Sequence, residues 1–420
     1  MFTPIFIFFV LLTTAIKFWL SHRQLRHVMQ HRTQVPPTFV DRVPLEAHQK
    51  AADYTAAKLR LGNIEIFLHT FLLIAFTLLG GIDWLNQALL GVLGSGLWQQ
   101  LALIASVVTV GALFDLPLSW IHQFRLEEKF NFNRMSLKLW VIDLFKGTLL
   151  TAAIGLPLLA VILTLMQLSG SLWWLYTWLV WVSFNLLILV LYPTFIAPLF
   201  NKFVPLQDPT LKTRIEALLS KCGFKVSGLF VMDGSKRSGH GNAYFTGLGR
   251  SKRIVFFDTL LSQLTHPEIE AVLAHELGHF KHAHVIKRIF WSFALSLLLL
   301  ALLGWLTQQS WFYTGLGVTP QLGAGASNNA LALLLFFYVA PAFTFPLQPL
   351  SSWLSRRHEY QADAYAAQQT DANDLINALV KLYKDNASTL TPDPLHSAFY
   401  DSHPAALLRV QHLQQPIQES

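Results

Sequence analysis

The chain has 420 residues, of which 53% are hydrophobic and only 13% are charged, and its mean hydropathy is +0.42. A soluble protein carries about a quarter charged residues, so this composition excludes an ordinary soluble protein and indicates a polytopic membrane protein. The net charge of +7 comes from Lys and Arg residues that flank apolar stretches without forming an aromatic-interleaved patch, so nucleic acid is not an expected partner.

Seven apolar stretches approach or exceed the about 20 residues that cross the hydrocarbon core of a bilayer. They are centred in 2–20, 64–82, 92–114, 141–167, 172–197, 289–308 and 329–352. The first has no charged residues before its apolar run and no convincing small-residue cleavage site, so we expect a retained span rather than a signal peptide. We therefore predict a mainly α fold with about seven transmembrane helices in contact with membrane lipids.

Lys and Arg are distributed unevenly along the chain. They are absent from 61–124, 147–201 and 289–355 and concentrate between and after these ranges. Because cytoplasmic loops carry an excess of Lys and Arg, we expect the basic segments in the cytoplasm, the N-terminus outside and the C-terminus inside. Every polar segment of substantial length then lies on one side of the membrane.

The longest polar region, 198–288, has the pattern of a small α+β domain. The amphipathic run Lys212–Lys221 predicts a helix. Three short runs favour β-strands, at 228–232, 242–246 and 253–257. Gly247 and Gly249, between the last two runs, indicate a hairpin. The edge of such a sheet can hold an extended peptide through backbone hydrogen bonds.

The sequence His275-Glu276-Leu277-Gly278-His279 follows these strands. Thr265 and Glu268 predict a capping box at the start of a helix that contains it. Residues four apart share a helix face, so the two histidines can bind one Zn²⁺, with Glu276 beside a water at the metal. The alternative is a surface helix that carries two unrelated histidines.

A catalytic zinc site needs a third protein ligand, and Glu359 is the best candidate. It begins a predicted helical segment after the last apolar stretch. Asp363, one turn later, could accept the free ring N–H of either ligating histidine and so fix its tautomer. The alternative is that both carboxylates belong to a solvated helix face beside Arg356 and Arg357.

Two further histidines and one cysteine lie near these segments. His282 can share the face of His279, whereas His284, five residues beyond it, cannot; we interpret both as interfacial or substrate-side histidines. Cys222 is the only cysteine, so it forms neither an intrachain disulfide nor a thiolate zinc site, and we interpret it as a small buried residue.

Several segments together resemble the type I CAAX prenyl proteases, which are integral-membrane zinc metallopeptidases of the HExxH…E (gluzincin) type. The segments are Glu127–Asn133, Ile196–Phe203, Asn242–Phe245, the HExxH sequence, Ser355–Asp363, and Ser402-His403-Pro404 with Arg409. The resemblance covers nearly the whole chain. It implies a barrel of seven helices around a large water-filled chamber, which the zinc domain closes at one end.

The resemblance also implies roles for individual residues. His275, His279 and Glu359 would be the zinc ligands and Glu276 the catalytic glutamate. Asn242, with Ala243 and Tyr244 beside it, would bind the substrate backbone. His403 and Arg409 would be substrate-side or transition-state groups near the zinc. Members of the family remove the last three residues of prenylated proteins, so the expected partners are peptide or protein substrates, possibly prenylated.

The expected organisation has four parts. They are an N-terminal membrane region with five helices and basic cytoplasmic loops (1–197), a zinc peptidase core (198–288), transmembrane helices six and seven (289–354), and a C-terminal peptidase part with the third ligand (355–420). The HExxH helix runs almost directly into the sixth span. We therefore expect one zinc ion at the cytoplasmic surface of the membrane, the inner membrane in bacteria or the endoplasmic reticulum in eukaryotes.

The predicted function is that of a membrane-embedded zinc metalloendopeptidase that hydrolyses peptide bonds near the C-terminus of prenylated or membrane-associated peptides. Two alternatives remain open. One is a general quality-control protease for membrane proteins, without a prenyl requirement. The other is a transporter or scaffold with a structural zinc, suggested by the polar residues Glu65, His69 and Asn185 within the predicted spans.

Overall fold

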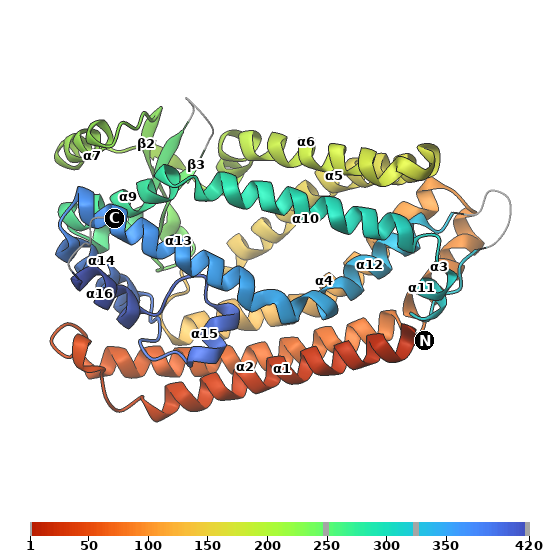
Figure 1. Ribbon diagram of the computed structural model, residues 1–420, viewed down its shortest axis with the longest axis horizontal. Coiled ribbons are helices and arrows are strands. Elements are labelled where there is room, and N and C mark those ends of the chain that lie inside the picture. The colour runs from red at the N-terminus through yellow and green to blue at the C-terminus, as the bar shows by residue number, and fades with distance from the viewer. Residues whose placement is uncertain (1, 247–251, 322–326, 416–420) are drawn as a thin grey trace.

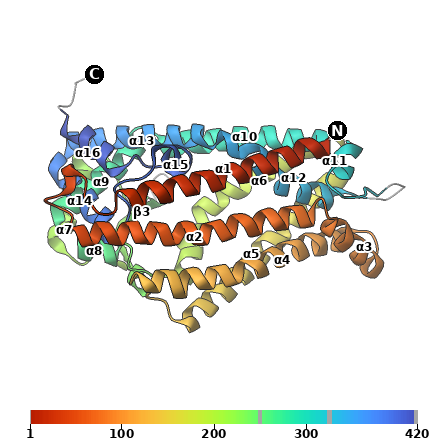
Figure 2. The ribbon, with the colours of Figure 1, turned by 90° about the horizontal axis from the view of Figure 1, so that it is seen from below.

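The computed structural model describes residues 2–246, 252–321 and 327–415. Within them, seven helical segments are long and apolar enough to cross a membrane, as the sequence predicts. The long helices run along the longest axis of the molecule, and the sheet and shorter helices gather at one end (Figure 1). The N-terminus lies at the opposite end of the long helices (Figures 1 and 2).

The spanning segments are built from eight long helices. They are α1 (Phe2–Gln30), α2 (Leu45–Phe76), α4 (Leu97–Ile121), α5 (Leu137–Leu168), α6 (Trp173–Leu191), α10 (His284–Leu306), α12 (Asn329–Thr344) and α13 (Gln348–Gln369). A π-helical turn, η2 (His122–Glu127), extends α4. A short 3-10 turn, η8 (Phe345–Leu347), separates α12 from α13. The predicted division at 354/355 falls inside α13, which continues beyond the last span.

One apolar helix was not expected from the sequence. Between the predicted spans 64–82 and 92–114, the chain forms α3 (Gly81–Leu93), which packs against α4. It has an apolar face without being long enough to span a membrane, so its 13 residues lie between two spans.

The small sheet has four strands in the order β1-β2-β4-β3. The strands are β1 (Phe203–Pro205), β2 (Gly228–Met232), β3 (Ala243–Thr246) and β4 (Arg253–Phe257). β2 and β4 are parallel, and the other two pairs are antiparallel. β3 therefore lies at an edge, paired with β4 alone. Its antiparallel pairing agrees with the predicted hairpin, whose turn at Gly247 and Gly249 lies outside the described residues.

Shorter helices complete the domain around this sheet. They are α7 (Pro209–Lys221), α8 (Asp258–Gln263), α9 (His266–Lys281), α14 (Ala372–Asp385), α15 (Pro394–Tyr400) and α16 (Ala406–Gln414), while α11 (Ser310–Thr314) lies at the far end of the membrane region. The buried side chains of the sheet and of the helices around it form a hydrophobic core distinct from that of the membrane helices. Cys222 packs against this core but is only partly buried.

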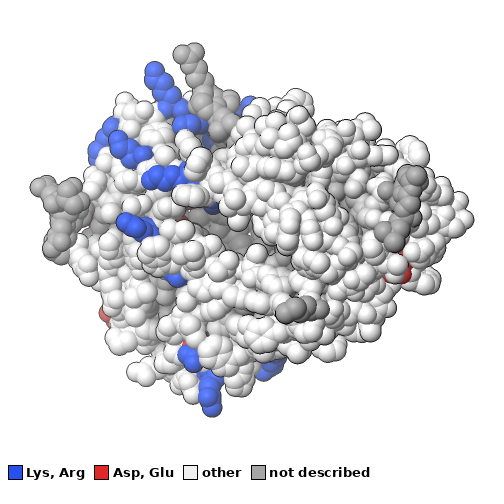
Figure 3. Space-filling model, turned by 45° about the vertical axis from the view of Figure 1, so that its right-hand side comes forward, with Lys and Arg blue, Asp and Glu red and all other residues white. Residues whose placement is uncertain are grey.

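The outer surface of the long helices is apolar. Large side chains such as Phe67, Phe145 and Leu298 are exposed on them, and in Figure 3 Lys and Arg gather over one side of the molecule while the rest of the visible face is almost free of charge. A contiguous apolar surface of this size suits lipid rather than water. The structure thus has the form of a multi-pass membrane protein.

Two adjoining cavities lie inside the helical region. The larger, about 880 Å³, reaches from α1 and α2 to the start of β3 and the end of α15. The smaller, about 470 Å³, lies deeper among α1, α2, α4 and α12. Lys17, Gly62, Glu65 and Ile66 line both. This arrangement agrees with the predicted chamber enclosed by helices.

Candidate metal centre

The HExxH sequence lies in the C-terminal half of α9, with His279 in the last turn, where the helix packs against α13. The helix begins with the predicted capping box, in which the Thr265 backbone N–H donates to Glu268 Oε2 at 2.7 Å. Gly278 permits the contact between the helices, because a Cβ there would lie 2.8 Å from Ala362 Cα and 3.0 Å from Ala362 O. These are backbone atoms that cannot move aside, so the glycine sets how closely α13 approaches.

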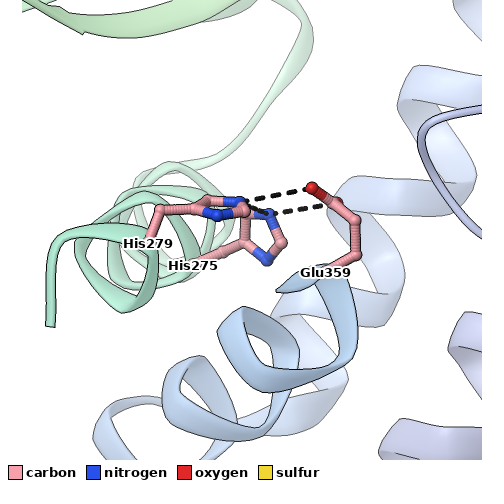
Figure 4. A group of neighbouring side chains, drawn as sticks. All are labelled: His275, His279 and Glu359. Atoms are coloured by element: carbon pink, nitrogen blue, oxygen red, sulfur yellow. Dashed lines mark hydrogen bonds and ion pairs between the residues drawn. The ribbon is translucent and has the colours of Figure 1, made fainter. Parts of the chain in front are cut away.

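This close approach brings three potential ligands together. His275 and His279 point from α9 toward Glu359 on α13 (Figure 4). The two Nε2 atoms are 3.3 Å apart, and they lie 3.5 and 3.3 Å from the carboxylate oxygens of Glu359. A tetrahedral zinc site with metal–ligand distances of about 2.0–2.1 Å has ligand atoms about 3.3–3.5 Å apart. The observed separations therefore fit a zinc ion held by these three side chains.

The outer nitrogen of His275 is held by a charged pair. His275 Nδ1 lies 2.8 Å from Asp363 Oδ1, and Arg409 donates two hydrogen bonds to the same carboxylate at 2.8 and 2.6 Å. Asp363 has no exposed surface and Arg409 is 5% exposed. Burial disfavours the charged imidazole, but the Asp363 and Glu359 carboxylates outweigh it and raise the pKa of His275 to about 9. A metal cation at Nε2 of His275 would take the place of the proton that faces Glu359, while the Nδ1–H group would still donate to Asp363.

The outer nitrogen of His279 is held by a different group. Its Nδ1 lies 3.0 Å from Nδ1 of His284, whose Nε2 lies 2.8 Å from Gln361 Oε1. The expectation that His284 cannot share the face of His279 is therefore wrong. It assumed one continuous helix, whereas α9 ends at Lys281 and the chain turns before His284 begins α10. His282 makes no hydrogen bond to the three ligands within the described chain.

The remaining predicted catalytic residues occupy different positions around the ligands. Glu276 is partly buried on α9, next to His275. His403 Nδ1–H donates to Glu359 Oε2 at 2.6 Å, and its side chain is 60% exposed, so it borders the open side of the site. Arg409 is buried and paired with Asp363, and its Nη1 also lies 3.7 Å from Glu359 Oε2. Its surroundings are those of a group that orients His275.

The predicted substrate-binding residues lie at the sheet edge. Asn242 precedes β3 and lines the larger cavity. Asp401, two residues before His403, also lines this cavity. Ala243 is partly buried and packs against the core of the domain. Tyr244 points elsewhere, into a small space against Pro193 and Phe230; burial raises its pKa to about 12. Asn242 thus borders the larger cavity just before β3, whereas Tyr244 lines a separate space.

Further polar residues tie this edge to the membrane region. His240 Nε2 lies 3.4 Å from Glu127 Oε2, and Glu127 also accepts a hydrogen bond from Tyr54 Oη at 2.6 Å. Asn386 Oδ1 accepts from the Gly241 backbone N–H at 3.2 Å and lies 3.1 Å from His240 Nδ1. Glu127 belongs to a segment singled out in the sequence, but nothing local in the sequence indicated that it meets His240.

Comparisons with known proteins agree with this architecture. The family model described as the CAAX prenyl protease N-terminal domain with five membrane helices matches residues 24–202. The model of peptidase family M48 matches residues 205–417. The two matches together cover the domain that holds the metal centre and the membrane helices apart from most of α1.

Individual relatives match over most of their length. CAAX prenyl protease 1 of Saccharomyces cerevisiae is 34% identical, with 93% of this chain and 90% of the relative covered. The human CAAX prenyl protease 1 homolog is 31% identical, with 94% and 91% covered. The crystal structure of S. mikatae Ste24p superposes with a TM-score of 0.91 at 33% identity and covers 99% of both chains.

Proposed function

Since the chain belongs to peptidase family M48 and carries the five-helix N-terminal domain of the CAAX prenyl proteases, we propose that this membrane protease is a zinc endopeptidase that cleaves near the C-terminus of prenylated peptides. The observation that carries the zinc assignment is the spacing of His275, His279 and Glu359, whose ligand atoms converge at the separations of a tetrahedral site. The names of the relatives support the prenylated substrate class.

The proposed mechanism divides the work among the residues around the three ligands. Bound zinc supplies a Lewis acid that polarises the scissile carbonyl and makes water a better nucleophile. Glu276 accepts the proton of the attacking water and delivers it to the leaving amine. Asp363 and Arg409 keep His275 oriented.

His403 is the proposed stabiliser of the developing oxyanion. It lies on the open side of the site and already hydrogen-bonds the carboxylate of Glu359. A donor aimed at an oxyanion is worth about 2.7–4 kcal/mol. Arg409, which the sequence assigned to the same role, is instead proposed to act through Asp363, because its guanidinium is enclosed behind the ligands.

The substrate is proposed to lie along β3. The free edge of this strand offers backbone donors and acceptors to an extended peptide. Asn242, at the start of the strand, would hold the substrate backbone, and the larger cavity beside it would take the adjoining residues. The lining of that cavity includes Lys17, Lys58 and Glu65, which suits a hydrated peptide segment more than a lipid chain.

The site is proposed to face the cytoplasm. Buried residues in the described parts of the proposed peptidase core and C-terminal part share one hydrophobic core, and the sheet and shorter helices around it gather at one end of the long helices. The excess of Lys and Arg in these segments supports the cytoplasmic assignment.

The test is cleavage of a farnesylated peptide ending in C-a-a-X and of its unprenylated twin by the detergent-purified protein, with Glu276→Gln as control. Cleavage of the farnesylated peptide alone, abolished in the variant, is the expected result. Equal cleavage of both peptides would replace the prenyl-dependent function with that of a general membrane-protein protease. Cleavage of neither by zinc-loaded protein would refute the proposed function.

A further inference from the structure

His284 is a buried polar residue in direct contact with a proposed metal ligand. It is the first residue of the membrane helix α10 and is 4% exposed. Its ring bridges two helices of the peptidase domain, with Nδ1 facing His279 of α9 and Nε2 facing Gln361 of α13. Gln361 lies two residues after Glu359, so the bridge joins the two helices that carry all three proposed ligands.

The hydrogen bonds around His284 permit one consistent arrangement. If His279 Nε2 presents its lone pair to a metal, the ring proton of His279 lies on Nδ1. That N–H must donate to His284 Nδ1, which therefore carries no proton. The proton of His284 then lies on Nε2 and donates to Gln361 Oε1. In this arrangement both ring nitrogens of His284 and both of His279 have a partner. The tautomer in which His279 binds a metal is therefore fixed by the amide oxygen of Gln361.

The backbone before His284 is shaped to place it there. Ala283 has φ 53° and ψ 32°, in the left-handed region that costs a non-glycine residue about 1–2 kcal/mol. His282 and Ala283 separate α9 from α10, and the left-handed turn at Ala283 brings His284 back over His279. On its other side the His284 ring stacks on His358, with centroids 4.0 Å apart and planes 13° apart. The ring is thus held on several sides.

We propose that His284 is a positioning residue for the metal: it fixes the tautomer and orientation of His279 and so links the sixth membrane helix to metal affinity. The inference rests on the proposed zinc function. Most metal-ligating histidines donate their second N–H to a carboxylate, a backbone carbonyl or water. Here the acceptor is a second histidine, His284, which in turn donates a hydrogen bond to the side-chain amide of Gln361.

The test is the zinc affinity of the full-length protein in detergent, measured by competition with a chromophoric chelator after metal removal. His284→Leu is expected to weaken zinc binding about tenfold to hundredfold, the range for loss of a group that orients a ligand. His284→Asn, which keeps an oxygen acceptor near the position of Nδ1, is expected to retain most of the affinity. His282→Leu is the matched control, because that histidine is more exposed, stacks beside His284 with ring centroids 5.5 Å apart and bonds no ligand. It removes a neighbouring ring without removing a hydrogen bond, and should bind zinc as the parent does.

Two further measurements separate positioning from a general loss of structure. The absorption spectrum of the cobalt-substituted protein reports ligand geometry and should change in His284→Leu but not in His282→Leu. If His284→Leu does not fold, Gln361→Met removes the terminal acceptor with little change in shape and should weaken zinc binding in the same direction by a smaller factor.

Parent-like zinc affinity in His284→Leu, or an equal loss in His282→Leu, would overturn the inference. Failure of the parent protein to bind zinc would overturn the proposed function and this inference with it. This outcome can be told apart from failure of the inference alone, because it is measured on the parent protein without any variant.

Discussion

The two sides of the metal centre are built from different chemistry. On one side, His275 is held by the buried ion pair of Asp363 and Arg409, which joins α13 to α16. On the other, His279 is held by the neutral side chains of His284 and Gln361, which join α10 to α13. A buried ion pair is costly to break because it leaves an unpaired charge, whereas loss of a neutral partner leaves only an unsatisfied hydrogen-bonding group. The charged side therefore stabilises the domain as well as the ligand.

The largest expected effect comes from a residue that belongs to neither side. Glu276→Gln should lower kcat for peptide cleavage by about two to four orders of magnitude, because it removes the general base. Zinc stoichiometry, measured on the purified variant, should stay at the parent value since both histidines keep their supports. Parent-like turnover would show that another group takes the proton.

Breaking the charged side should affect stability and metal together. Asp363→Ala removes both hydrogen bonds from the buried Arg409 guanidinium to Asp363 and leaves the longer 3.7 Å contact of Nη1 with Glu359 Oε2. It should cost about 3–5 kcal/mol, seen as a lower thermal unfolding temperature in detergent. The double variant Asp363→Ala/Arg409→Met removes the unpaired charge and should recover much of that stability without recovering zinc affinity. A single and double variant of equal stability would contradict the ion-pair explanation.

The distance between α9 and α13 can be changed without replacing any of the residues that hold His275 and His279. Gly278→Ala places a methyl group against the backbone of α13, so the helices must separate or the side chains must strain, at a cost of about 1–3 kcal/mol. Zinc affinity should fall because Glu359 moves away from both histidines. Leu277→Val, on the same helix, changes the core without affecting that contact, and provides the control for a general packing defect. Unaltered affinity in Gly278→Ala would show that α13 adjusts freely.

The smallest effect is expected at the start of α9, remote from both supports. Burial opposes the ionisation of Glu268, but the hydrogen bonds from Lys381 and from Thr265 lower its pKa below the ordinary value. Its stabilising contribution is therefore present at neutral pH and is lost as the pH falls through that lowered pKa. Glu268→Gln should cost about 1–2 kcal/mol at pH 7.

The pH dependence of this difference distinguishes the charge from the shape of the side chain. The difference in unfolding temperature between parent and Glu268→Gln should shrink toward acid, below the ordinary glutamate pKa of about 4.3. Zinc affinity at pH 7 should match the parent. A difference that stays constant with pH would show that the carboxylate charge does not contribute.

Local sequence was sufficient to predict features that depend on residues close together in the chain. The seven spans follow from runs of apolar side chains, since a helix in lipid must satisfy its own backbone and needs nothing from its neighbours. The capping box at Thr265 and the strands β2 and β4 were confirmed because caps and strand patterns are properties of a few consecutive residues. Glu359 was proposed as the third ligand because it lies on a predicted helix after the last apolar stretch and because of the family resemblance, and the structure places it beside both histidines.

Tertiary structure decided where residues from separate elements meet. The sequence could not show that the chain turns at Ala283 and returns His284 to His279, because a left-handed alanine has no sequence signal. It could not show that Arg409 faces Asp363 instead of the open side, because the burial of α16 depends on the packing of the whole domain. The meeting of His240 with Glu127 likewise depends on how the peptidase domain sits on the membrane helices. The candidate ligands, and with them the kind of chemistry, can therefore be predicted from the sequence, whereas the groups that orient those ligands are determined by long-range packing.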